Sequence, residues 1–112
     1  MLFRSDADIV ADCRFLPNPR WVADLAALTG QDERVRDYVL SRPGAAEFLD
    51  LYLSALRVVL AGYEREGKRF VTLAIGCTGG KHRSVAMAEH IASQLRVKGP
   101  AVQVLHRDLG RE

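Results

Sequence analysis

The residue types best suited to chemistry gather in one short segment, from Gly76 to Ser84, which reads GCTGGKHRS. Its glycines let the backbone approach a ligand without a Cβ in the way. A helix predicted to start near Ser84 would point its free N–H groups into this loop, where they favour anions. The guanidinium of Arg83 suits a bidentate contact with phosphate. The segment therefore predicts a site for a phosphate-type anion.

The spacing Cys77-x5-Arg83-Ser84 also resembles the signature of cysteine-dependent phosphatases. In those enzymes a thiolate at the base of the loop attacks phosphorus, and the arginine holds the phosphoryl oxygens. Gly76 stands where that signature has a histidine, and Asp12 is the only near candidate for a general acid. We therefore expect binding without catalysis, and phosphatase activity is the alternative.

Composition favours one ordinary globular domain. The chain has 112 residues, of which 48% are hydrophobic and 27% charged, and its net charge is +2. We expect a single domain over residues 1–112, with too balanced a charge to indicate nucleic-acid binding. The sequence shows no signal-peptide pattern and no apolar stretch long enough to cross a bilayer, so we expect a cytoplasmic chain with no membrane association. Its two cysteines, Cys13 and Cys77, are expected to be free thiols.

Alternating strand and helix patterns predict an α/β fold. Strands are expected at 9–15, 70–75 and 101–106, and helices at 32–40, 45–66 and 84–96. This order favours a small three-layer domain, with a parallel sheet flanked by helices and the anion-binding loop after a central strand. Parallel strands end at the same edge of a sheet, where ligands bind in this architecture.

The predicted strand ends carry a surplus of basic side chains. Asp12 and Arg14 lie toward the end of the first strand, the loop follows the second, and His106 ends the third. No Cys-x-x-Cys or His-x3-His pair occurs, so we expect neither a metal nor a cofactor.

Two apolar features lie outside the loop. The helix predicted over 45–66 is apolar beyond a single stripe, which predicts burial on two sides or self-association. Its main stripe is expected to comprise Phe48, Tyr52, Leu56, Val59 and Tyr63. Trp21 is expected to anchor an irregular segment to the core.

A longer resemblance covers nearly the whole chain, from about Asp6 to Arg107. It is carried by DCRFLPNP at 12–19, LTG at 28–30, IGCTGGKHRSV at 75–85, and HR at 106–107. These motifs resemble the C-terminal domain of the RapZ/YvcJ family. Members of this bacterial family have a Walker-motif domain in their N-terminal half. Their C-terminal half resembles a sugar-kinase-like fold, binds glucosamine-6-phosphate and forms oligomers, and in enteric members it presents small RNAs to an RNase.

The resemblance implies that this chain is a non-enzymatic sensor or adapter domain for an amino-sugar phosphate. It implies sugar-phosphate contacts at seven positions, namely Asp12, Cys77, Thr78, Gly79, Gly80, His82 and Arg83. Together with the loop argument, the expected ligand-binding set is Asp12, Arg14, Arg20, Cys77, Thr78, Gly79, Gly80, Lys81, His82, Arg83, Ser84 and His106.

The chain departs from the family pattern at two places. Arg20 stands where a histidine follows Asn-Pro in the family, which keeps a cation there but changes its chemistry. The last residues, DLGRE, lack the Lys/Arg-rich tail of enteric members, so a small RNA is expected to bind only weakly. The resemblance also implies an RNase as a partner. No Walker A loop occurs in these residues, so the N-terminal domain is not part of them and no ATP or GTP site is expected.

Overall fold

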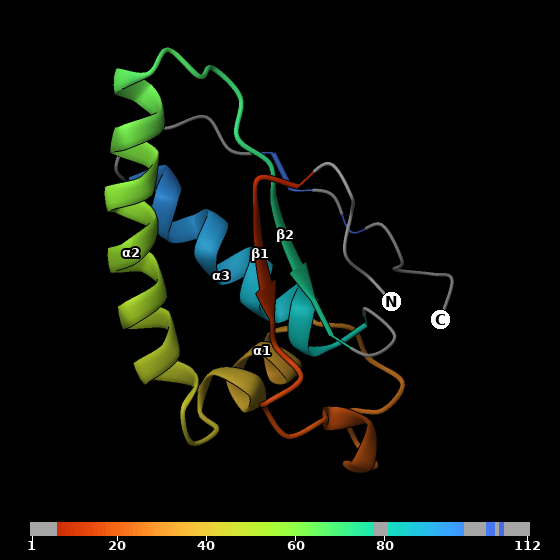
Figure 1. The fold of residues 1–112 in the computed structure, drawn as a ribbon. Coiled ribbons are helices and arrows are strands. Elements are labelled where there is room, and N and C mark those ends of the chain that lie inside the picture. Colours follow the sequence, from red (N-terminus) through yellow and green to blue (C-terminus); the bar gives the residue numbers. More distant parts are fainter. Residues whose placement is uncertain (1–6, 78–80, 98–102, 105, 107–112) are drawn as a thin grey trace.

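A computed structural model describes residues 7–77, 81–97, 103–104 and 106. Figure 1 shows a short sheet with a long helix beside it and a second helix behind it. In chain order the elements are β1 (Ile9–Asp12), the 3-10 helix η1 (Pro19–Trp21), α1 (Glu33–Leu40), α2 (Ala45–Arg65), β2 (Leu73–Gly76) and α3 (Arg83–Val97). The expected α/β class, parallel sheet and flanking helices are confirmed. The strand predicted over 101–106 lies mostly outside the described residues.

β1 and β2 pair in parallel, in a register that runs from Ile9 opposite Leu73 to Asp12 opposite Gly76. Both strands are shorter than predicted. The first ends at Asp12 because the chain turns there, with the Leu16 N–H donating to the Cys13 carbonyl at 3.3 Å. The second was expected from Phe70 but begins only at Leu73. Phe70 is exposed, so it has no layer to pack against.

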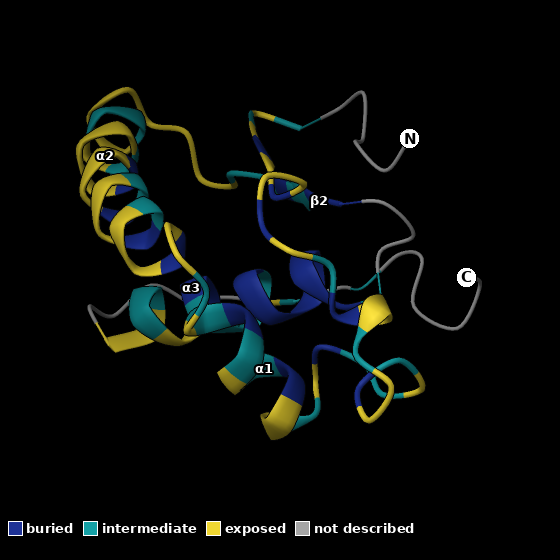
Figure 2. Cartoon of the chain, turned by 90° about the horizontal axis from the view of Figure 1, so that it is seen from below, coloured by how far each residue is buried: buried dark blue, intermediate teal, exposed yellow. Residues whose placement is uncertain are grey.

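α3 is the central element of the core. Its residues from Arg83 to Met87 are buried, and it contacts both β2 and α1 (Figure 2). Ile91 of this helix is buried as well. Burial on nearly all sides of the first turns means that their backbone positions are set by packing.

α2 starts and stops within a residue of the prediction, but its buried face is different. Among the five positions of the expected stripe only Leu56 is buried, and Val59 is exposed. The face toward the core instead carries Ala45, Leu49, Leu53 and Leu56. Figure 2 shows the rest of this helix largely exposed or half-buried. Its outward face includes Leu51 and Val58, which are exposed.

The segment between β1 and α1 is held differently from the prediction. Trp21 was expected to anchor it, but this side chain is 82% exposed and the prediction is wrong. Buried side chains of this segment include Leu16, Pro19 and Leu25. Within the described residues, no helix is long and apolar enough to cross a membrane.

Candidate functional site

The two strands end side by side, which forms a strand-end edge consisting of Asp12, Cys13, Gly76 and Cys77. The Cys13 N–H donates to the Gly76 carbonyl at 2.8 Å, so the ladder continues one residue past β1. α3 begins at Arg83, a few residues along the chain from Cys77. The sequence therefore correctly placed Asp12 and the start of the loop at one edge of the sheet.

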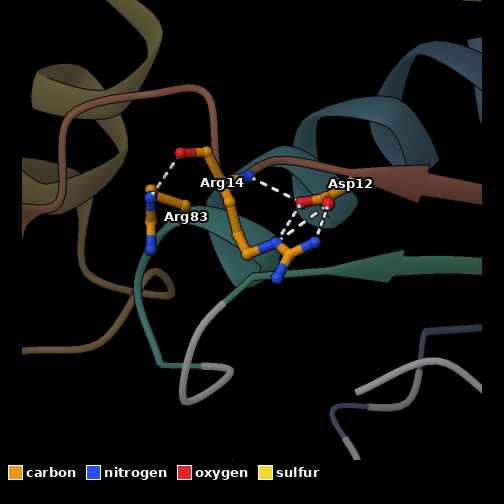
Figure 3. A network of polar contacts seen from close by, with 3 residues as sticks. All are labelled: Asp12, Arg14 and Arg83. Carbon is orange, nitrogen blue, oxygen red and sulfur yellow. Dashed lines mark hydrogen bonds and ion pairs between the residues drawn. The ribbon is translucent and has the colours of Figure 1, made fainter. Parts of the chain in front are cut away.

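Asp12 and Arg14 form an exposed ion pair at this edge (Figure 3). Arg14 Nε lies 2.9 Å from both carboxylate oxygens, and the Arg14 backbone N–H also donates to Oδ1 at 2.9 Å. These side-chain and backbone hydrogen bonds lower the pKa of Asp12, with a smaller contribution from Arg83. Asp12 is thus a carboxylate whose oxygens already have a guanidinium partner.

Arg83 is buried and ties the edge to the chain after β1. Its Nη1 donates to the Arg14 carbonyl at 3.0 Å and to the Leu16 carbonyl at 2.9 Å. Figure 3 shows Arg83 reaching Arg14 from the start of α3. From the sequence, this guanidinium was predicted to bind phosphate. Its hydrogen bonds to the backbone carbonyls of residues 14 and 16 were not predicted.

Cys77 is buried beside Ser84, in the first turn of α3. The Ser84 backbone N–H donates to Cys77 Sγ at 3.2 Å, and the Cys77 thiol lies 3.2 Å from Ser84 Oγ. The thiol therefore faces the N-terminus of a helix, as the loop-into-helix interpretation expected. Thr78, Gly79 and Gly80 lie outside the described residues.

Cys13 is fully buried next to these groups. Burial raises the pKa of its thiol to about 12, and neighbouring Cys77 acts in the same direction. Tyr52, on α2, reaches the same region, where its hydroxyl is buried without a hydrogen-bond partner among the described residues. Burial and the nearby Cys13 raise the pKa of Tyr52 to about 12.

His82 faces the segment before α1. It is buried, and its Nε2 has no hydrogen-bond partner among the described residues. Burial lowers its pKa, while the backbone of Leu25, Ala26 and Leu28 acts in the opposite direction. The protonated form of the imidazole is therefore disfavoured beneath this segment.

The Leu28-Thr29-Gly30 motif has a clear structural cause. The Gly30 N–H donates to the Lys81 carbonyl at 2.8 Å. A Cβ at Gly30 would lie 2.5 Å from the Ala86 nitrogen and 2.5 Å from the His82 carbonyl oxygen. Only glycine permits this close approach to the first turn of α3. Sequence reasoning noted the motif but did not assign it this positioning role.

The remaining predicted site residues are Arg20, Lys81 and His106. Arg20 lies in η1, where its guanidinium is 5.9 Å from the centre of the Trp21 ring. His106 Nε2 lies 3.4 Å from Glu89 Oε1, further along α3. Lys81 is half-buried just before the helix. The structure thus brings together Asp12, Arg14, Cys77, Arg83 and Ser84, and separates His106 from Ser84 along α3.

A hollow of the described residues lies away from the strand-end edge. A groove of about 340 Å³ lies between α2 and α3, and it includes none of the predicted residues. It is lined by Leu49, Asp50, Leu53, Ser54, Arg57, His90 and Gln94. Over the same part of the chain, no group of three or more His, Cys, Asp or Glu side chains is placed to hold a metal ion.

Fold and site together define a small α/β domain with a strand-end edge that leads into the buried N-terminus of a helix. The comparison with protein families gives the more particular assignment. Residues 3–110 match the model of the RapZ C-terminal domain. The chain belongs to this family, and the resemblance noted from its motifs is confirmed.

Relatives with similar sequences agree with this assignment. The chain is 64% identical over 107 residues to a nucleotide-binding protein of Thermobifida fusca, and 65% identical to nucleotide-binding proteins of Frankia alni and Mycolicibacterium vanbaalenii. These alignments cover 96% of the chain and 36%, 37% and 34% of those proteins. The chain therefore spans about a third of the length of the curated relatives it matches.

Proposed function

We propose that this chain is a cytoplasmic, non-enzymatic sensor domain that binds an amino-sugar phosphate of the glucosamine-6-phosphate type at the strand-end edge. The observation that carries the proposal is the placement of Cys77 against the Ser84 N–H, beside Arg83, because it directs the N-terminus of α3 toward the loop after β2. Helix N-termini favour phosphate through their free N–H groups and dipole. Membership of the RapZ C-terminal domain family supports the same ligand class.

The phosphate would lie over residues 79–81, with their backbone N–H groups as donors. Arg83 Nη1 is engaged by the Arg14 and Leu16 carbonyls, so a bidentate phosphate contact would use the opposite side of the guanidinium, Nε and Nη2. This arrangement would give Arg83 two tasks, since the same group that closes the turn would present its other edge to the anion.

Asp12 is proposed to recognise the ammonium group of the sugar. Its carboxylate is exposed at the same edge, but it already pairs with Arg14. A ligand ammonium would therefore share the carboxylate with the guanidinium or displace it. Asp12→Asn should reduce the preference for glucosamine-6-phosphate over glucose-6-phosphate, and it should leave phosphate recognition in place.

Calorimetry with glucosamine-6-phosphate, glucose-6-phosphate and inorganic phosphate tests this proposal. Lys81→Ala and Asp12→Asn are the informative variants, because these two side chains are exposed or half-buried and their loss should leave the core intact. We expect Lys81→Ala to weaken all three ligands and Asp12→Asn to affect only the amino sugar. Equal affinity of the wild-type chain for both sugars would contradict the role of Asp12.

This proposal includes a small RNA and an RNase as further partners of the domain. It also includes self-association of the chain into homo-oligomers. Phosphate contacts would dominate RNA binding, so its affinity should fall steeply with salt. Tight binding of a structured RNA at physiological salt would contradict the weak-binding expectation.

A cysteine-dependent phosphatase is the second candidate, favoured by one specific contact. Ser84 donates to the sulfur of Cys77, and both belong to the Cys-x5-Arg-Ser spacing. Hydrolysis of an aryl phosphate that is abolished in Cys77→Ser would establish the enzyme. Binding of sugar phosphate without turnover would favour the sensor.

A further inference from the structure

The two free cysteines lie at equivalent positions of adjacent parallel strands. The Ile9 N–H donates to the Thr72 carbonyl at 3.2 Å, and Ile9 pairs with Leu73. The Cys13 N–H donates to the Gly76 carbonyl at 2.8 Å in the same pattern. The residue opposite Cys13 is therefore Cys77, the next pair after Asp12 and Gly76 in the register.

Both thiols also belong to the same side of the sheet. Side chains alternate along a strand, so Cys13 shares a side with Ala11, which is also buried. By the same alternation Cys77 shares a side with Ile75, and residues paired in register present their side chains to the same face. The electrostatic effect of Cys77 on the pKa of Cys13 agrees with this proximity.

The spacing of paired strands suits a cross-link. Adjacent strands lie about 4.7–4.9 Å apart, which falls within the range of about 4.4–6.8 Å that disulfides span between Cα atoms. The cysteines are free in this structure. From this juxtaposition we infer that Cys13 and Cys77 form a reversible intramolecular disulfide when a peroxide reaches the strand-end edge.

The chemistry proceeds in two balanced steps. Hydrogen peroxide oxidises the Cys77 thiol to a sulfenic acid and releases one water. The sulfur of Cys13 then attacks the sulfenic sulfur, the S–S bond forms, and the hydroxide that leaves takes the Cys13 proton as a second water. Cys77 is the first target because it retains slight exposure, whereas Cys13 has none and stays protonated until the second step.

The cross-link would have a local structural consequence. In the reduced chain Cys77 Sγ contacts both the backbone N–H and the hydroxyl of Ser84. A bond to Cys13 would turn the sulfur toward β1 and remove its capacity to donate to the hydroxyl. The inference concerns a modification site, and it holds whether or not a sugar phosphate binds nearby.

Intact-mass spectrometry of the full chain tests the inference. The folded protein is treated with hydrogen peroxide, then denatured and alkylated with iodoacetamide. We expect a product about 2 Da lighter that carries no alkyl group, a peptide linking Cys13 to Cys77 after digestion, and recovery of both alkylation sites after dithiothreitol. The matched variants Cys13→Ala and Cys77→Ala should give no such product, and Cys13→Ala should accumulate sulfinic acid at Cys77.

The same oxidation carried out in urea distinguishes a disulfide that the fold favours from one that forms by random contact in the unfolded chain. Closing a loop of this length in an unfolded chain carries an entropic cost, so the second step, from the Cys77 sulfenic acid to the cross-link, should be at least about tenfold faster in the folded protein. Full alkylation of both cysteines after peroxide, or higher oxides without a linked peptide, would overturn the inference. A cross-link that forms only in urea would overturn it as well.

Discussion

Removing the Arg83 side chain should destabilise the fold before it affects any ligand. The guanidinium is buried, and its Nη1 donates to the Arg14 and Leu16 carbonyls at 3.0 and 2.9 Å. Each charged hydrogen bond contributes about 1.5 kcal/mol at the lower end of its range, so Arg83→Ala should lower the free energy of unfolding by about 3 kcal/mol. At an m-value of about 2 kcal/mol/M, the urea midpoint should fall by roughly 1.5 M.

Two comparisons make this measurement specific. Arg83→Lys keeps the charge, but its single ammonium does not reproduce the planar guanidinium, so it should recover less than half of the lost stability. Arg14→Ala removes an exposed guanidinium from the same network and should leave the midpoint almost unchanged. If Arg83→Ala unfolded at the wild-type urea concentration and yet lost phosphate binding, the guanidinium would serve the ligand alone and this reasoning would fail.

Three further results are expected. In urea titration, Gly30→Ala should lower the free energy of unfolding by about 2–3 kcal/mol, because the new Cβ would lie 2.5 Å from backbone atoms. The control Gly62→Ala in α2 meets only Arg65 Nη2 at 3.7 Å, so it should raise the free energy of unfolding by about 0.5–1 kcal/mol. Equal effects of the two substitutions would contradict the close approach at Gly30. Folding lowers the pKa of His82 below its usual 6.5, so the unfolded chain binds the proton more readily than the folded chain. The free energy of unfolding should therefore decline as pH falls below about 6.5, and His82→Gln should flatten this pH dependence. Light scattering should detect self-association, and Val58→Glu on the exposed face of α2 should yield monomers.

Local sequence signals predicted the helices well. Asp32, the first residue of the helix predicted over 32–40, caps α1 by accepting from the Arg34 N–H, and Gly67 has the left-handed backbone that follows the end of α2. The common edge of Asp12 and Cys77 followed from strand order alone. The helix ends depend on neighbours in the chain, and the common edge depends on the order of the elements, both of which a sequence displays directly.

Features that depend on distant partners were not predictable in the same way. Arg83 appeared as a ligand by its type, but its Nη1 contacts carbonyls 67 and 69 residues away in the chain. The buried face of α2 was misassigned because the helix is apolar on several sides, and only packing selects Leu49 and Leu53 for the core. Trp21 was misassigned because its large apolar ring predicted burial, whereas η1 leaves it exposed.

The central claim is that the edge formed by β1, β2 and the start of α3 binds an amino-sugar phosphate. Isothermal titration of the wild-type chain with glucosamine-6-phosphate, in competition with inorganic phosphate, tests it most directly. The proposal predicts saturable binding of one ligand per chain, weakened by phosphate and weaker for glucose-6-phosphate. No heat of binding from a folded chain, or binding that phosphate does not compete with, would contradict it.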